Sequence, residues 1–202
     1  KVDFAIEGHI PWRNEACRKA GTLHLGGDLE EIVRTEAEIH RGNMPDRPFV
    51  LVGQQYLADP SRSAGDANPI WAYAHVPHGH RGDATDAVIR QIERFAPGFR
   101  KQIVAMTHRT TEGFASYNAN YVGGDLLTGA NTPRPLMFRP RVTVSPYRTG
   151  VPGVFLCSAA TPPGAGVHGM CGANAAEIAL RDLRGTSHTT ADTRLTQGSD
   201  HQ

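Results

Sequence analysis

Residues 153–183 read GVFLCSAATPPGAGVHGMCGANAAEIALRDL, and this stretch decides how the rest of the chain is interpreted. Residues 154–157 form a short apolar run that is typical of a buried strand. Residues 161–166 hold two prolines and two glycines, so they cannot lie inside a helix. From about Gly169 the chain is rich in alanine and predicts a helix. The expected order is strand, loop, helix.

The predicted helix has a defined face and a defined end. Four apolar residues recur at i, i+3, i+4 and i+7, which indicates one buried face: Ala176, Ala179, Leu180 and Leu183. The expected end lies near Arg184, because Gly185 follows it as a stop.

The loop of residues 158–170, called the glycine loop below, is where we expect a ligand. Glycines leave their N–H groups unshielded, and a helix N-terminus carries roughly half a positive charge. Such a loop suits a phosphate or another developing anion. The alternative is a tight loop that only packs the helix against a sheet.

Residues 164–169 also match the pattern G-x-G-x-x-G of a Rossmann dinucleotide site. That fingerprint needs a second strand and an acidic residue about twenty positions further on. Residues 185–202 contain no apolar run that could form this strand. We therefore favour a loop that completes a site whose other half lies elsewhere.

Composition sets broader limits. The chain has 202 residues, of which 39% are hydrophobic and 20% charged, as in ordinary globular proteins with one large or two small domains. A formal net charge of +1 argues against nucleic acid as a partner. No apolar run approaches the ~18 residues of a membrane span, and no signal peptide is visible. The wide spacing of Cys17, Cys157 and Cys171 argues against a disulfide framework or a zinc site. We expect a reducing, cytoplasmic setting.

Alternating short elements predict an α/β fold of mixed α and β content. Strands are expected at residues 2–6, 22–25, 48–53, 70–76 and 103–106. Helices are expected at residues 29–41, 86–96 and 111–117, with loops at 59–69 and 118–152. The polar residues 185–202 are expected to form a mobile tail. The chain opens in strand pattern without Met, which we interpret as a piece of something longer.

The first of these helices starts with a capping-box-like pair, Asp28 and Glu31. Its expected apolar stripe consists of Leu29, Ile32, Val33 and Ile39.

Two further groups of side chains are candidate sites. Trp71, Tyr73 and His75 share one face of a predicted strand, where they either line a pocket for a flat, apolar ligand or simply pack on the sheet. The triplet His75, His78 and His80 is the best metal candidate. Because Pro77 and Gly79 place it on a turn, and no cysteine or carboxylate pair completes a shell, we expect loop histidines and no metal.

Residues 156–176 resemble the C-terminal flavin-contacting segment of the phytoene desaturase-like FAD-dependent oxidoreductases, which share their architecture with the amine oxidases. The residues at the family's matching places are Thr161, Pro163, Gly164, Gly166 and Gly169. Residues 92–99, 120–125 and 146–148 also look like the family, so the resemblance covers most of residues 1–183.

Two departures from the family pattern stand out. Family members often carry Gly-x-Gly-Thr-His where this chain has residues 158–162, SAATP. The family's N-terminal βαβ unit, which binds the ADP half of FAD, is not in this chain.

The resemblance implies a C-terminal part of an FAD-dependent dehydrogenase or desaturase that removes hydrogen from a C–C or C–N bond of a hydrophobic substrate. It implies a substrate-binding lobe at residues 1–150, built on a mixed sheet with helices. Residues 151–184 would be the closing strand, loop and helix of the FAD domain. The isolated chain is expected to be inactive without the dinucleotide-binding half.

The residues implied to contact FAD are Ser158, Thr161, Gly164, Gly166, Val167, His168, Gly169 and Met170. No catalytic side chain is assigned, although His168 is the titratable group nearest the expected flavin edge. Implied partners are the substrate and the N-terminal half, and self-association and peripheral membrane contact are kept open. The alternative function is a non-catalytic binding or oligomerisation module derived from the same fold.

Overall fold

A computed structural model describes residues 1–127, 129 and 138–196, with side chains through residue 184. The chain forms two compact units, Lys1–Asp125 and Leu126–Gln202, and each is described by itself. Helices and strands are both present, so the predicted α/β class is confirmed. The functional boundary expected at residue 150 stays a prediction, because the observed division concerns compactness alone.

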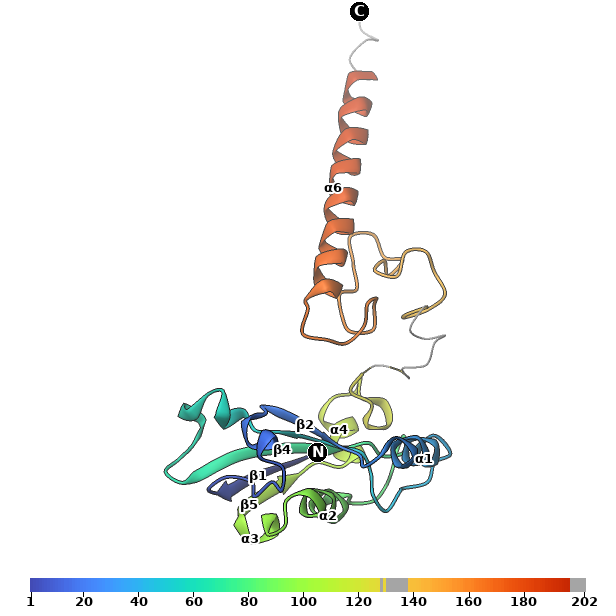
Figure 1. Ribbon diagram of the computed structural model, residues 1–202. Coiled ribbons are helices and arrows are strands. Elements are labelled where there is room, and N and C mark those ends of the chain that lie inside the picture. The colour runs from blue at the N-terminus through green and yellow to red at the C-terminus, as the bar shows by residue number, and fades with distance from the viewer. Residues whose placement is uncertain (128, 130–137, 197–202) are drawn as a thin grey trace, which may run out of the picture. The chain divides into compact units, whose positions relative to one another are not determined.

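Unit 1 is built on a five-stranded sheet with the order β2-β3-β4-β1-β5 (Figure 1). The strands are β1 (Val2–Glu7), β2 (Thr22–Leu25), β3 (Val50–Gly53), β4 (Ala67–Ala74) and β5 (Ile103–His108). Every pairing in this sheet is antiparallel. Strand β4 begins inside the loop predicted at residues 59–69, because Ala67 and Asn68 pair with Glu7 and Ile6 of β1.

The helices of unit 1 are α1 (Leu29–His40), α2 (Thr85–Phe95), α3 (Phe99–Gln102) and α4 (Thr111–Tyr117). Unit 1 also contains four short 3-10 helices: η1 (Glu15–Lys19), η2 (Gln55–Leu57), η3 (Pro60–Arg62) and η4 (Val122–Gly124). Helices α2 and α3 lie together on one face of the sheet (Figure 1).

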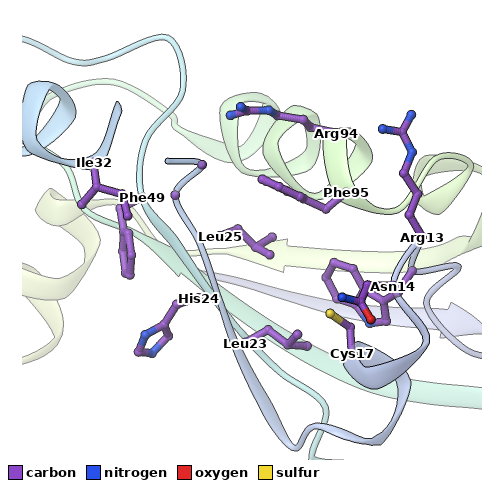
Figure 2. Close-up of a pocket in the computed structure, with 13 residues that line it drawn as sticks. Arg13, Asn14, Cys17, Leu23, His24, Leu25, Ile32, Phe49, Arg94 and Phe95 are labelled. Carbon is purple, nitrogen blue, oxygen red and sulfur yellow. The ribbon is translucent and has the colours of Figure 1, made fainter. Parts of the chain in front are cut away.

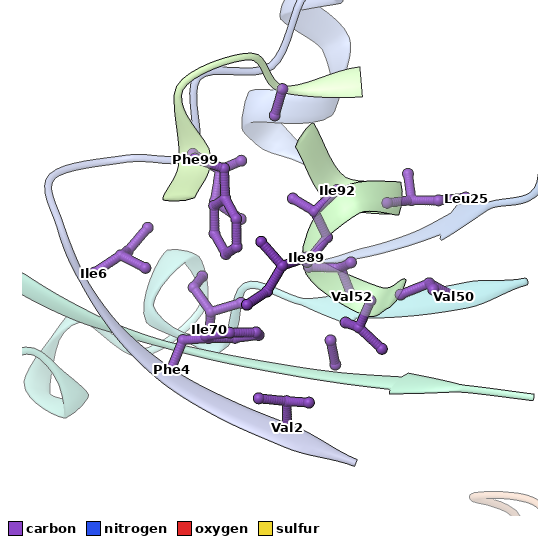
Figure 3. Close-up of a cluster of buried hydrophobic side chains, with 14 of the residues drawn as sticks. Val2, Phe4, Ile6, Leu25, Val50, Val52, Ile70, Ile89, Ile92 and Phe99 are labelled. Atoms are coloured by element: carbon purple, nitrogen blue, oxygen red, sulfur yellow. The ribbon is translucent and has the colours of Figure 1, made fainter. Parts of the chain in front are cut away.

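The core of unit 1 fills the space between that face and α2 (Figure 3). Alternation along β1 turns Val2, Phe4 and Ile6 to the same side, and all three are buried. Helix α2 adds Ile92, which is fully buried, and Phe99 meets Phe4 edge to face at 5.3 Å. Each such side chain contributes about 1.5–3 kcal/mol by leaving water.

Helix α1 begins and ends as predicted but turns a different face inward. The Asp28 carboxylate accepts the Glu31 N–H at 2.8 Å, and Arg41 is the C-cap. The predicted apolar stripe is wrong at Leu29 and Val33, which are 73% and 61% exposed.

A polar contact explains which face of α1 is buried. Arg94 of α2 donates two hydrogen bonds, of 2.7 and 2.8 Å, to the carboxylate of Glu31. These hydrogen bonds hold the pKa of Glu31 below its ordinary value. Glu31 therefore turns toward α2, and Leu29 and Val33 are carried outward.

Helix α6 (Met170–Thr196) dominates unit 2 and starts where the sequence predicted. The predicted end near Arg184 is wrong, since the helical backbone continues through Gly185. A glycine within a helix lowers its stability by roughly 1 kcal/mol relative to alanine without ending it. The mobile tail expected at 185–202 thus has helical backbone to Thr196, and residues 197–202 lie outside the described residues.

The buried face of α6 also differs from the prediction. Cys171 and Ala175 are buried, whereas Leu180 and Leu183 of the predicted face are 51% and 63% exposed. The strand expected at residues 154–157 is wrong as well, because only one bridge forms, between Phe155 and Arg148. In the described part of unit 2 there is no neighbouring strand to extend that bridge.

Among the described residues, no helix combines the length and the apolar character needed to cross a bilayer.

Candidate functional site

The glycine loop is folded onto its own backbone at Thr161. The Thr161 side chain is fully buried, and its N–H and hydroxyl donate to the Ser158 carbonyl at 2.9 and 2.8 Å. The Gly164 N–H then donates to the Thr161 carbonyl at 2.8 Å. These bonds close two successive turns ahead of α6.

Tyr147 and Cys171 fix the buried side of the loop through its backbone carbonyls. The Tyr147 hydroxyl donates to the Pro162 carbonyl at 2.7 Å and accepts from the side-chain amide of Asn174 at 2.9 Å. The buried Cys171 thiol lies 3.3 Å from the Gly164 carbonyl and 3.5 Å from the Thr161 carbonyl, as a weak donor to both. The loop is thereby fixed to the first turns of α6.

Two arginines add further links inside unit 2. The buried Arg139 donates from Nη1 to the Ala159 carbonyl at 3.2 Å. Arg148 forms a two-point ion pair with Asp182 of α6, with both N–O distances at 2.6 Å. Gly164 has a φ of +100°, and an added Cβ would lie 3.3 Å from Arg139 Nη1, so this position requires glycine.

The outer side of the loop is open. Residues 165–170 are exposed, and Val167 is fully so. Within the part of the chain that the structure describes, the N–H groups of residues 165–169 have no hydrogen-bond partner. The Met170 N–H donates to His168 Nδ1 at 3.0 Å, which fixes the imidazole ring beside Gly166. A row of free donors thus precedes the N-terminus of α6.

The predicted FAD contacts separate into two groups by exposure. Those at the surface are Ser158, Gly166, Val167, His168, Gly169 and Met170. Thr161 and Gly164 are buried and maintain the turns, so they present little surface to a ligand. The cofactor role of all eight residues stays a prediction.

Unit 1 carries a row of aromatic side chains on the sheet face opposite the core, as the alternation predicted. Trp71 stacks on Tyr73 with ring centroids 5.7 Å apart, and Tyr73 stacks on His75 at 6.2 Å. We call these three side chains the aromatic row. The Trp71 indole lies where a Cβ at Gly53 would be, so glycine lets the ring rest on the neighbouring strand.

The three histidines considered for a metal are each engaged separately. His75 Nδ1 lies 2.8 Å from the Glu36 carboxylate, and the His78 ring covers Gly123. The His80 carbonyl accepts a hydrogen bond from the Thr111 hydroxyl. The described residues contain no cluster of three or more metal-binding side chains.

The sequence reasoning missed a cavity of about 560 Å³ in unit 1 (Figure 2). It lies beside the edge strand β2, bordered by η1 and the end of α2, and we call it the edge cavity. Its wall includes Trp12, Cys17 and Leu23 from one part of the sequence and Phe95 from a distant part. Only the long-range contact between Arg13 and Phe95 reveals it, and no local sequence pattern indicates it.

Comparison with known proteins adds an independent line of evidence. The chain is 37% identical over 190 residues to the rat "Pyridine nucleotide-disulfide oxidoreductase domain-containing protein 2", covering 88% of this chain and 32% of the rat protein. It is 37% identical over 176 residues to the mouse protein of the same name, covering 81% of this chain and 30% of the mouse protein.

The relatives are oxidoreductase-domain proteins. This likeness supports a relationship to oxidoreductases and does not single out the phytoene desaturase-like family. The chain spans about a third of the length of these relatives. No protein-family model matches it.

Proposed function

We propose that this chain supplies part of an FAD-dependent oxidoreductase, in which the glycine loop contacts the flavin and unit 1 holds a hydrophobic substrate. The observation that carries the proposal is the row of free N–H groups at residues 165–169, exposed and next to the start of α6. The named oxidoreductase relatives support the same direction.

The residues of the loop fit the polar edge of a flavin. That edge carries carbonyl oxygens, which accept hydrogen bonds, and the loop offers donors from Val167, His168 and Gly169. FAD, when bound, would supply the redox chemistry of hydrogen removal from the substrate. The N-terminus of α6 stabilises negative charge at this edge by about 0.3–2 kcal/mol.

Two side chains of the loop have their polar atoms oriented by local bonds. The Ser158 Oγ accepts the Ala160 N–H at 3.1 Å, which leaves the hydroxyl proton to donate outward. His168 Nδ1 accepts from Met170, so in the neutral imidazole the proton is on Nε2, beside Gly166. Both are positioned as donors to a ligand, and neither is assigned as an acid or base.

The aromatic row is the surface we propose for the substrate. Its three rings are partly buried and stacked, so they offer a flat apolar surface on the sheet. Such a surface favours a hydrophobic substrate over a charged one. The dinucleotide-binding half needed for turnover is proposed to be a separate segment of the longer enzyme.

A second function is a non-catalytic binding or oligomerisation module. Exposed apolar side chains in unit 2 favour it, among them Val142, Val144 and Val151. Self-association or contact with a membrane surface would cover them. A monomer in light scattering, with no vesicle binding, would count against this alternative.

The test is to mix this chain with the N-terminal half of a related oxidoreductase and to record the flavin absorbance after removing free FAD. We expect a stoichiometric flavin band from the mixture and none from this chain alone. Failure of the mixture to retain flavin at any ratio of the two halves contradicts the proposal.

A matched pair of variants locates the contact. Val167→Asp places a negative charge beside the free N–H groups and is expected to weaken flavin retention about tenfold, roughly 1.4 kcal/mol. Val144→Asp changes an equally exposed valine outside the glycine loop and is expected to have no effect. Equal behaviour of the two variants would move the flavin away from this loop.

A further inference from the structure

The edge cavity of unit 1 is not part of the proposed flavin site and has the features of a second binding site. Its volume of about 560 Å³ lies within the range of small-molecule sites. The apolar part of its lining includes Leu23, Leu25, Phe49 and Phe95. Figure 2 shows these side chains gathered beside β2.

The charges at the cavity have one sign. Arg13 and Arg94 line it, and no aspartate or glutamate does. Arg94 is already bonded to Glu31. The guanidinium of Arg13 has no hydrogen bond or ion pair with any described residue, and it is exposed. An unpaired cation therefore stands beside an apolar hollow.

The wall that carries Arg13 is held in place by buried polar contacts. The Trp12 indole N–H donates to the Gln54 side chain at 3.0 Å. The amide of Gln54 donates in turn to the carbonyls of Cys17 and Ala20, at 2.9 and 2.7 Å. The Arg13 N–H donates to the Phe95 carbonyl at 3.0 Å, which ties the wall to the end of α2. The cavity is thus formed before a ligand arrives, which lowers the entropic cost of binding.

We propose that the edge cavity binds a small amphipathic anion, with its apolar body against Leu23 and Phe95 and its carboxylate at Arg13. The cavity would accept a medium-chain or aromatic carboxylate, because a strongly hydrated di-anion would have to desolvate against an apolar floor. Leu23 and Leu25 of β2 face the core side of the sheet, and the aromatic row lies on the other side. Phe49 links the two, because it lines the cavity and its ring centroid lies 4.9 Å from that of His75.

Binding is tested with two probes of equal chain length and opposite charge. Sodium dodecanoate and dodecyltrimethylammonium bromide are titrated into the full chain by calorimetry, below their micelle concentrations. We expect saturable one-to-one binding of dodecanoate, at least tenfold tighter than that of the cation. Equal affinities would overturn the role of Arg13, and no saturable binding of either would overturn the site.

Three variants locate the binding. Arg13→Gln is expected to weaken dodecanoate about tenfold and to leave the cation unchanged, because one charged hydrogen bond is lost. Lys19→Gln removes an exposed charge from the nearby 3-10 helix η1, outside the cavity, and is the control. Leu23→Trp fills the cavity and is expected to abolish binding, with an unchanged circular dichroism spectrum as the check on folding.

Trp12 provides a direct reporter of the same event. The chain has two tryptophans, so Trp71→Phe leaves the emission of Trp12 alone. A saturable change in this emission on adding dodecanoate, with the calorimetric affinity, is expected. Binding without any change in Trp12 emission would place the ligand outside the edge cavity and contradict the proposal.

Discussion

Each of the two units of this chain is stabilised internally, by a different kind of contact. Unit 1 closes a continuous apolar core between its sheet and α2. In the described part of unit 2, the buried residues are Arg139, Tyr147, Thr161, Gly164, Cys171 and Ala175, and most of them act through hydrogen bonds to the backbone. Unit 1 has the means to fold as an independent body, and unit 2 is a shaped surface with few apolar contacts of its own.

This difference relates to function. A loop held by backbone hydrogen bonds keeps its shape without side chains covering its outer side, which leaves the N–H groups of residues 165–169 available. An apolar core would have required that side to be packed. The same arrangement exposes Val151 and Val167, so unit 2 is the part in which we expect a partner surface.

The largest effect is expected where the core of unit 1 is opened. Ile92→Ala removes a fully buried side chain of α2 and should lower the free energy of unfolding by about 2–5 kcal/mol. The measurement is urea unfolding followed by far-ultraviolet circular dichroism. Val104→Ala, at a 65% exposed position of β5, is the control, with a change below about 0.5 kcal/mol. A loss under 1 kcal/mol for Ile92→Ala would show that the core is not what stabilises unit 1.

A smaller effect is expected at the ion pair beneath α1. Glu31→Gln leaves Arg94 without its charged acceptor and should cost about 1.5–3 kcal/mol at pH 7. The pKa of Glu31 is lowered in the folded state by the hydrogen bonds from Arg94, so its contribution is complete above the ordinary value of 4.5. It is lost as the pH falls through the lowered pKa.

Urea midpoints of the wild type and Glu31→Gln, measured from pH 7 down to pH 3, check this dependence. The difference in unfolding free energy should be constant above about pH 5 and should shrink below pH 4.5. Glu30→Gln, in the same turn and exposed, should show no such trend. A gap between wild type and Glu31→Gln that persists unchanged at pH 3 contradicts the assignment.

The smallest effect is expected in unit 2, where single hydrogen bonds replace the core. Tyr147→Phe removes the bonds to Pro162 and Asn174 and should cost about 0.5–1.5 kcal/mol locally. Amide hydrogen exchange at the start of α6 should accelerate about two- to tenfold while that of unit 1 stays unchanged. Tyr117→Phe, at an exposed tyrosine of unit 1, is the control.

The sequence predicted unit 1 better than unit 2, for reasons visible in particular residues. Val88, Ile89 and Ile92 are large, and their spacing allows one buried face, so α2 was predicted within a residue at each end. In α6 two of the four candidates, Ala176 and Ala179, are alanines, which are small and bury almost as favourably on either side. The observed face of Cys171 and Ala175 has the same helical spacing as the predicted one.

The remaining misses needed information that no local pattern holds. A strand at residues 154–157 depends on a neighbour to pair with, and only Arg148 bridges it. The edge cavity depends on Arg13 and Phe95 meeting across the fold. Thr161 and Gly164 are ligand contacts implied by the resemblance, and this role stays a prediction; their burial shows that they also shape the loop, which the sequence pattern did not indicate.

The burial of Cys171 makes the rate of its alkylation a measure of how often the glycine loop opens. Its thiol is shut beneath the carbonyls of Thr161 and Gly164, whereas Cys157 stands in solvent and Cys17 is half covered. An alkylating reagent will therefore modify Cys157 first. It will reach Cys171 only when the glycine loop transiently separates from α6. The rate of Cys171 alkylation therefore reports the frequency of this opening. A ligand bound to the N–H groups of residues 165–169 will lower that rate.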